Sequence, residues 1–145
     1  MEDKFIRVRS IKDIVISSIL TITGTVLVII PSSDPLNILG FFTIVTGLLL
    51  AFILKTAYKH KDNGEKFQKK EIFYGNEMRD RLKSALTSPM DFRHTQESQG
   101  STLRMDVYYN KTKAYMQLLE YIPYKYEPCS AVHEHSFDKV SNLIK

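Results

Sequence analysis

The sequence predicts a membrane protein of two parts: an N-terminal hairpin of two transmembrane helices, followed by a small α+β cytosolic domain. Two uncharged apolar stretches near the start, Ile14–Ser33 and Pro35–Leu54, are each 20 residues long and are separated only by Asp34. A helix rises about 1.5 Å per residue, so each stretch can span a hydrocarbon core of roughly 30 Å. Because lipid offers the backbone no hydrogen-bond partners, two helices are the structure expected here.

Basic residues on both sides of the hairpin predict its orientation. Four precede the first span and six follow the second: Lys4, Arg7, Arg9, Lys12, Lys55, Lys59, Lys61, Lys66, Lys69 and Lys70. The turn 31–35 carries none, so the positive-inside rule places both termini in the cytoplasm, in a protein that crosses the inner membrane twice. A cleaved signal peptide is the alternative for the first span. Against it, the apolar core is too long, no small-x-small cleavage site follows, and a second span begins at once.

Composition divides the chain into four segments. Residues 1–13 form a short amphipathic lead, expected at the membrane surface, and residues 14–55 form the transmembrane hairpin. Residues 56–70 are a charged connector, broken at Asn63-Gly64, whose lysines suit anionic lipid headgroups. Residues 71–145 form the cytosolic α+β domain, which is small enough that oligomerisation would help to stabilise it.

Hydrophobic periodicity predicts the first elements of this domain. A helix is expected over Glu71–Ser88, where apolar residues recur at helical spacing and Pro89 ends the pattern. A polar loop, Thr95–Ser101, follows. Two stretches that alternate with a period of two, Thr102–Tyr109 and Ala114–Ile122, are expected to form a strand hairpin.

The end of the domain is expected to complete the sheet and to close with a helix. Tyr124–Tyr126 is flanked by prolines, which favours an edge strand, and Ser130–His135 can extend the sheet. Ser136 can then cap a final helix, Phe137–Ile144, which turns apolar residues inward.

The two spans contain no ionisable residue, which argues against proton relays, ion-coupled transport and voltage sensing. They do contain small and hydroxyl side chains at helical spacing: Ser17, Ser18, Thr21, Gly24, Thr25, Gly40, Thr43 and Gly47. These residues favour close packing of one helix against the other. The alternative is that the hydroxyl groups line a pore, which would require several copies of the chain.

The cytosolic part lacks the motifs of the common enzyme classes. It contains no Gly-rich phosphate loop, no nucleophile elbow, no His-Glu-x-x-His and no Cys-x-x-Cys, so neither an enzyme nor a cofactor is expected. Cys129, His133 and His135, with His94 as a fourth ligand, suggest a metal site or a Cys–His nucleophile. Only the His-x-His spacing supports convergence, so surface histidines are the favoured interpretation and no metal is predicted. A single cysteine excludes an intramolecular disulfide.

Charge and aromatic residues predict the type of ligand. Residues 65–145 contain 13 Lys/Arg and 11 Asp/Glu, which does not mark a binder of long nucleic acid. Locally, however, cations and rings surround the predicted strand hairpin, and these groups can neutralise phosphates and stack on bases. The alternative to a ligand site is structural: the tyrosines, including Tyr115, are half-buried strand residues, and the lysines form a solvated face. The candidate ligand-binding residues are Arg93, His94, Arg104, Tyr108, Lys111, Lys113, Tyr124, Lys125 and His133.

The layout of span pair, charged connector and short domain resembles the small membrane effectors of type III CRISPR systems that bind cyclic tetra-adenylate. The resemblance covers the whole chain and rests on length, topology and the basic-aromatic region Arg104–Lys113, with no signature motif. It implies an antiviral effector that binds a cyclic oligoadenylate, assembles as a homo-oligomer, with a tetramer favoured, and permeabilises the inner membrane. A membrane scaffold or accessory subunit, whose cytosolic domain binds a protein partner, is the alternative.

Overall fold

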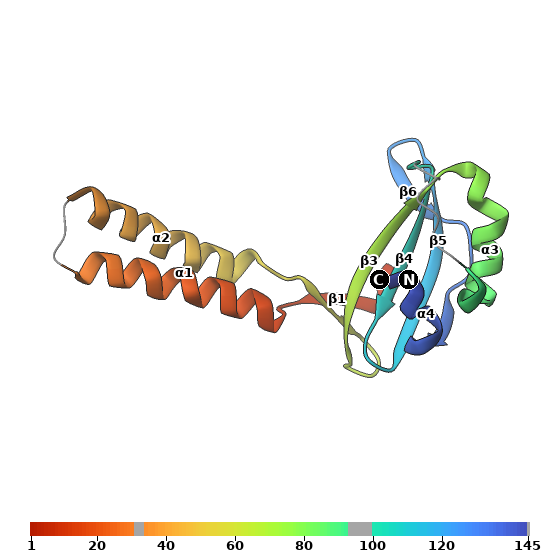
Figure 1. Ribbon diagram of the computed structural model, residues 1–145, viewed down its shortest axis with the longest axis horizontal. Helices are drawn as coiled ribbons and strands as arrows, with labels where there is room; N and C mark the ends of the chain where they lie inside the picture. Colours follow the sequence, from red (N-terminus) through yellow and green to blue (C-terminus); the bar gives the residue numbers. More distant parts are fainter. Residues whose placement is uncertain (31–33, 93–99, 145) are drawn as a thin grey trace. The chain divides into compact units, whose positions relative to one another are not determined.

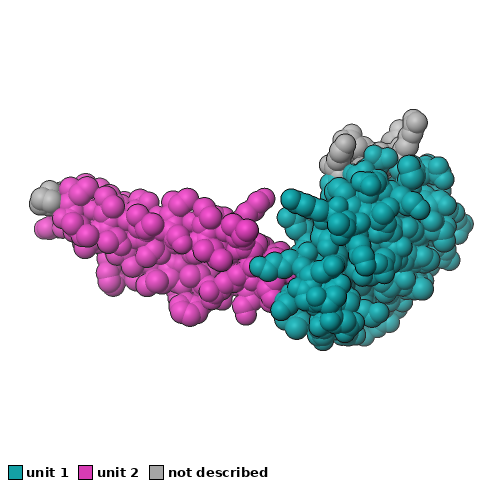
Figure 2. Space-filling view, turned by 90° about the horizontal axis from the view of Figure 1, so that it is seen from below, with its two compact units in different colours: residues 1–6, 59–145 teal, residues 7–58 magenta. Residues whose placement is uncertain are grey.

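The computed structural model describes residues 1–30, 34–92 and 100–144 (Figure 1). The described chain separates into two compact units (Figure 2). Residues 7–58 form one, here called the hairpin unit; residues 1–6 together with residues 59–145 form the other, here called the sheet unit.

The hairpin unit consists mainly of two long helices, α1 (Ile11–Ile29) and α2 (Asp34–Ile53), which pack side by side (Figure 1). Both are long and apolar enough to cross a membrane. Their large apolar side chains point outward: Phe41, Phe42 and Phe52 are each more than half exposed. The two helices expected from the apolar stretches are therefore confirmed, although α1 begins three residues earlier than predicted. The turn predicted at residues 31–35 lies largely outside the described residues.

A polar clasp holds the base of the hairpin unit together. Ser10 caps α1 and accepts a hydrogen bond from the backbone N–H of Asp13, and the Asp13 carboxylate accepts one in return from the Ser10 N–H. The same carboxylate accepts from the backbone N–H and the hydroxyl of Thr56, at 2.9 and 2.7 Å, just beyond the end of α2. The sequence Ser-Ile-Lys-Asp is a capping-box pattern, and it is the signal that could have placed the helix start correctly.

Small residues form the contact between α1 and α2. A Cβ atom placed on Gly24 would lie 2.7 Å from the carbonyl oxygen of Gly40, and one on Gly47 would lie 2.5 Å from the Thr21 hydroxyl. The Thr21 and Thr25 hydroxyls donate to carbonyl groups one turn earlier in their own helix. This arrangement supports the packing interpretation of the small and hydroxyl residues over the pore interpretation.

The sheet unit is built on a seven-stranded sheet with the order β1-β2-β3-β4-β5-β6, in which β7 also pairs with β5. The pairings of β3 with β4, of β4 with β5, and of β5 with both β6 and β7 are antiparallel. The strands are β1 (Phe5–Val8), β2 (Ala57–His60), β3 (Lys66–Tyr74), β4 (Leu103–Tyr109), β5 (Lys113–Ile122), β6 (Lys125–Pro128) and β7 (His133–Ser136). The helices are α3 (Arg79–Thr87) and α4 (Phe137–Ile144), and 3-10 turns lie at Glu2–Lys4, Asn76–Met78 and Pro89–Asp91.

The second half of this unit follows the sequence prediction closely. β4 and β5 match the two predicted strands within one residue at each end, and α4 has the predicted bounds. β6 is the predicted edge strand, shifted by one or two residues, and β7 extends the sheet as expected. Helix α3 ends at Thr87, and Pro89 starts a separate 3-10 turn, so the proline does end the helix.

The first half differs from the prediction in three places. The predicted helix over Glu71–Ser88 begins only at Arg79, because residues 71–74 complete β3. The segment 56–70, expected to be a connector, contains β2 and the start of β3, joined by a turn in which Gly64 has a φ of +71°. The lead 1–13 contributes β1 to the sheet, and the Phe5 ring is buried.

The hydrophobic core lies between one face of the sheet and the two helices α3 and α4 (Figure 1). Alternate residues of β4, among them Leu103, Met105 and Val107, point into it and are fully buried. From the helices come Leu82, Leu86, Val140 and Leu143. The other residues of β3, β4 and β5 therefore point to the opposite face, which carries the candidate site.

Burial of Tyr74 in this core gives the protein a specific alkaline instability. Burial raises the pKa of the Tyr74 phenol to about 12, from an ordinary value of 10. Between those values the unfolded chain loses the phenolic proton and the folded chain keeps it, so stability falls as pH rises. The expected loss is about 2 kcal/mol between pH 10 and pH 12. Urea unfolding of wild type and Tyr74→Phe over this range measures it; equal pH dependence of the two proteins would contradict the assignment.

Candidate functional site

The face of the sheet opposite the core, here called the open face, brings charged and aromatic side chains of β3 and β4 together. Antiparallel register places each open-face residue of one strand beside one of the other. The pairs are Lys69 with Tyr108, Glu71 with Asp106, and Phe73 with Arg104. This mixture of cations, carboxylates and rings is the most concentrated polar chemistry in the described part of the chain.

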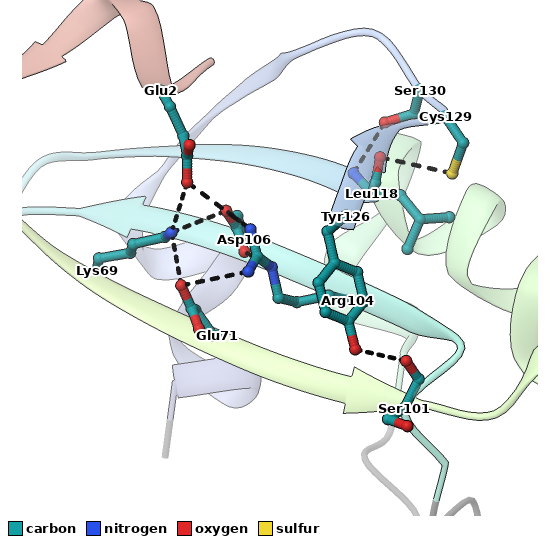
Figure 3. Close-up of polar contacts among 10 residues, drawn as sticks. All are labelled: Glu2, Lys69, Glu71, Ser101, Arg104, Asp106, Leu118, Tyr126, Cys129 and Ser130. Carbon is teal, nitrogen blue, oxygen red and sulfur yellow. Dashed lines mark hydrogen bonds and ion pairs between the residues drawn. The ribbon is translucent and has the colours of Figure 1, made fainter. Parts of the chain in front are cut away.

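Four of these side chains form a charge cluster with Glu2 from the start of the chain (Figure 3); they are Lys69, Glu71, Arg104 and Asp106. The Lys69 ammonium lies 2.6 Å from Glu71, 3.0 Å from Asp106 and 3.2 Å from Glu2. The Arg104 guanidinium lies 2.8 Å from the Asp106 carboxylate.

The outer contacts of Arg104 are looser than its contact with Asp106. Its nitrogens lie 3.7 Å from Glu2 and 3.8 Å from Glu71, which is beyond hydrogen-bond distance. The guanidinium is thus fixed on its inner side by a buried carboxylate, whereas its outer side makes only long-range ion pairs.

Burial strengthens the attraction between the opposite charges of the charge cluster, because little water screens them. The side chain of Asp106 is 1% exposed and that of Lys69 is 7% exposed. Burial raises the pKa of Asp106, and Lys69 and Arg104 oppose that rise. Burial lowers the pKa of Lys69, but hydrogen bonds to Glu71 and Asp106 outweigh it, so this pKa lies above its ordinary value and the ammonium stays charged. We regard Lys69 and Asp106 as ionised at neutral pH, because the buried Asp106 carboxylate faces the two cations Lys69 and Arg104.

Arg104 also belongs to an aromatic cluster formed by Phe73, Tyr121 and Tyr126. Its guanidinium carbon lies 4.6 Å from the centre of the Tyr126 ring (Figure 3), a cation–π contact. Phe73 and Tyr121 flank that ring at 6.0 and 5.2 Å and are 45% and 49% exposed. The Tyr126 hydroxyl donates to the carbonyl of Ser101, which fixes the ring. Arg104 therefore joins a charged surface to a partly exposed aromatic one.

The N-terminal residues lie on the open face as well. Phe5 is 8% exposed and stacks on Tyr108, with ring centres 4.2 Å apart and planes inclined by 13°. His60, Phe67 and Tyr115 contact the Phe5 ring from other sides, and we call these five rings the aromatic box. Phe5 thus anchors the start of the chain, and Glu2, three residues earlier, reaches the charge cluster.

The structure brings together two of the candidate ligand-binding residues, Arg104 and Tyr108, which share the open face of β4. Tyr108 is 1% exposed and covered by Phe5, so its ring lies within the aromatic box. Lys111 is exposed in the turn between β4 and β5. Lys113 lies next to that turn and pairs with Glu134 at 3.2 Å.

The remaining described candidates lie elsewhere. Tyr124 and Lys125 follow the opposite end of β5; Tyr124 is 97% exposed with a φ of +79°, and Lys125 pairs with Glu127 at 2.5 Å. His133 pairs with Met116, a core residue, and so belongs to the face covered by the helices. Arg93 and His94 lie outside the described residues. The candidates therefore do not converge on one point in the described part of the chain.

The hypothetical metal ligands do not converge either. Among the described residues, no group of three His, Cys, Asp or Glu side chains is placed to hold a metal ion. The rings of His133 and His135 lie parallel with centres 6.4 Å apart, and the His135 ring pairs with the carbonyl of Leu86 at 2.7 Å. The Cys129 thiol donates to the Leu118 carbonyl (Figure 3), and burial raises its pKa, which is the opposite of nucleophile activation.

Sequence reasoning missed Glu2, Lys69, Glu71 and Tyr126 as members of the candidate site. The available signal for Lys69 and Glu71 was the segment Phe67-Gln68-Lys69-Lys70-Glu71-Ile72-Phe73, in which apolar residues flank a charged centre. Charges at the centre of a strand indicate partners on the neighbouring strand, and β4 supplies Arg104 and Asp106.

Comparisons of the chain with protein-family models, with curated proteins and with solved structures find no match, so the function proposed next rests on the geometry described above and on the sequence resemblance.

Proposed function

We propose that the protein is a membrane-anchored antiviral effector whose sheet unit binds a cyclic oligoadenylate and which, as a homo-oligomer, opens or disrupts the membrane. The observation that carries the ligand class is the position of Arg104, which lies against the Tyr126 ring and also belongs to the charge cluster. A guanidinium next to partly exposed rings is a combination that suits a phosphate and a base.

The hairpin unit supports the membrane part of the proposal. Large apolar side chains cover the outside of both helices, and most of the two apolar stretches is exposed. Such a surface in water would be a severe aggregation hazard, whereas in a bilayer it is the expected lipid-facing surface. The basic residues around the spans support the proposed orientation, with both termini in the cytoplasm.

The chain connections support a coupling between ligand and membrane. Only Arg9 and Ser10 separate β1 from α1, and only residues 54–56 separate α2 from β2. Both helices are thus joined by very short segments to strands of the sheet. A ligand shifts such a system only by its difference in affinity between the resting and active states.

A homo-oligomer, with a tetramer favoured, fits the ligand's symmetry. A ring of four identical nucleotides presents four equivalent phosphates, and a ring of four subunits would present four copies of one site. The two helices of a single copy cannot enclose a channel, so membrane opening also requires several copies.

The proposal is tested with the full-length chain in lipid vesicles loaded with a self-quenching dye. Cyclic tetra-adenylate is expected to release the dye, whereas AMP, linear tetra-adenylate and cyclic di-adenylate serve as matched nucleotides that should not. The full chain is needed because β1 and β2 precede residue 65. An absence of both binding and release with every cyclic oligoadenylate would contradict the proposal.

A membrane scaffold that binds a protein partner is the second candidate. The observation that favours it is Tyr124, which is 97% exposed at a φ that side-chain-bearing residues rarely adopt. With Tyr121 and Phe73 also about half exposed, this end of the sheet resembles the aromatic centre of a protein interface. Loss of a co-purifying protein on Tyr124→Ser, with no response to nucleotides, would favour the scaffold.

A further inference from the structure

We propose that Lys69 and Arg104 form the phosphate subsite of the ligand, and that Glu2 occupies this subsite as an internal competitor in the described state. The inference rests on the proposed function and adds to it a site residue, Lys69, and a mode of regulation. A bound phosphodiester and the docked Glu2 carboxylate would exclude one another.

Glu2 differs from the other two carboxylates of the charge cluster. Asp106 and Glu71 belong to neighbouring strands, and their positions are fixed by the register of β3 and β4. Glu2 comes from the 3-10 turn before β1, and its side chain is 66% exposed. Of the three carboxylates, it is the one that can leave without any change in the sheet (Figure 3).

The charges permit replacement of Glu2 by another oxyanion. The cluster holds two cations and three carboxylates, and exchange of the Glu2 carboxylate for a singly charged phosphodiester leaves its net charge unchanged. Glu2 lies 3.2 Å from Lys69 but 3.7 Å from Arg104, so it makes a hydrogen-bonded contact with only one of them. A phosphodiester has two free oxygens, and it can accept from both cations at once.

The aromatic cluster lies where a base joined to that phosphate could stack. Arg104 contacts the Tyr126 ring on the same face, and the neighbouring Phe73 and Tyr121 expose about half of their surface. One nucleotide per subunit would then place its phosphate on the cations and its base on the rings. Adenine is a large planar base and stacks well on such surfaces.

Displacement of Glu2 also suggests how binding would reach the hairpin unit. Glu2 and Phe5 are the contacts that hold the start of the chain to the open face, and Phe5 begins β1. Loss of the Glu2 contact leaves that segment held by Phe5 and by the hydrogen bond that the Lys61 N–H donates to the Lys4 carbonyl. Because β1 runs into α1 after two residues, the ligand acts directly on the chain that enters the hairpin.

Binding of fluorescent cyclic tetra-adenylate to the full-length protein in detergent tests the subsite. Arg104→Gln is expected to weaken binding by about tenfold or more, the range for a charged hydrogen-bond partner. Glu2→Gln should strengthen it, by up to about fivefold, since an exposed ion pair no longer competes. Lys139→Gln removes an exposed positive charge on α4, on the other side of the sheet, and should leave the affinity unchanged.

The rings are tested in the same assay. Tyr126→Leu is expected to weaken binding by roughly fivefold or more, whereas Tyr126→Phe keeps the ring, loses only the hydroxyl contact with Ser101, and should weaken binding less than Tyr126→Leu does. Thermal unfolding of each variant identifies any loss of fold. Glu2 is exposed, so Glu2→Gln remains informative even if Arg104→Gln does not fold.

The outcomes separate the two proposals. If wild type binds but Glu2→Gln does not bind more tightly, the subsite is wrong and the proposed function still holds. The same follows if a folded Arg104→Gln binds as tightly as wild type. If neither wild type nor Glu2→Gln binds any cyclic oligoadenylate, both proposals are wrong. Tighter binding by Glu2→Gln together with loss in Arg104→Gln supports both.

Discussion

Replacing Gly24 with leucine is expected to separate α1 from α2. A Cβ atom at this position would lie 2.7 Å from the carbonyl oxygen of Gly40 and 2.7 Å from the backbone nitrogen of Ile44. Both are backbone atoms of the facing helix, so no side-chain rotation can relieve the contact. Overpacking in well-packed sites costs about 1–3 kcal/mol, and a clash with backbone on both sides should reach at least the upper end of that range.

A distance measurement between the helices tests this expectation. The single cysteine can be removed by Cys129→Ser, and spin labels can then be attached to cysteines at the exposed positions Ser18 and Thr46. Gly24→Leu should lengthen or broaden the distance distribution. Thr23→Leu is the matched control, because Thr23 is exposed and adjacent in sequence. An unchanged, narrow distribution in Gly24→Leu would show that the helices do not pack through this glycine.

Replacing Phe5 with alanine is expected to destabilise the sheet unit by about 3–5 kcal/mol, the usual cost of removing a buried phenylalanine. The ring is 8% exposed and contacts the four other rings of the aromatic box. Its removal leaves a cavity over Tyr108, which is otherwise 1% exposed. Such a loss is a large fraction of the stability of a small domain.

Denaturant unfolding followed by tyrosine fluorescence measures the effect of Phe5→Ala, since the chain has no tryptophan. Ile6→Ala provides the matched control: Ile6 is the next residue of β1 and is 50% exposed, so its removal should cost little. Equal stability of the two variants would mean that the N-terminal residues are not part of the folded sheet. Glu2 could then not act as the internal competitor at the phosphate subsite.

The elements that sequence reasoning predicted well are those whose pattern is local. β4 alternates strictly between buried apolar and other residues, and β5 begins again after a short polar turn, so period two identified both. The two long helices of the hairpin unit were evident because their length and lack of charge leave little choice of structure.

The elements that it missed depend on partners far away in the sequence. In the sequence, Lys69 looks like a residue of a solvated connector and Glu71 like the start of a helix. Only their pairing with Arg104 and Asp106 on β4 places them at the centre of a strand. Phe5 lies in a short charged segment, and its burial depends on rings contributed by β2, β3, β4 and β5.

The sequence predicted the kinds of side chain at the candidate site, cations and aromatic rings, but not most of the residues that form it. Arg104 was identified because a basic residue lies among aromatic residues in the strand pattern. Lys113 and Lys125 were included for the same reason. In the structure, however, Lys113 pairs with Glu134 on the adjacent strand β7, and Lys125 pairs with Glu127 on its own strand. Tyr108 was counted as a stacking ring although Phe5 covers it, because nothing local reveals the register of β1.

The central claim is that α1 and α2 lie in a membrane as a helical hairpin. Extraction of isolated membranes with alkaline carbonate tests it most directly, because this treatment releases peripheral proteins and leaves embedded ones in the pellet. The full-length protein is expected to remain in the pellet and to enter the supernatant only after detergent is added. Release of the protein by carbonate alone, or its recovery in the soluble fraction of a detergent-free lysate, would contradict the account.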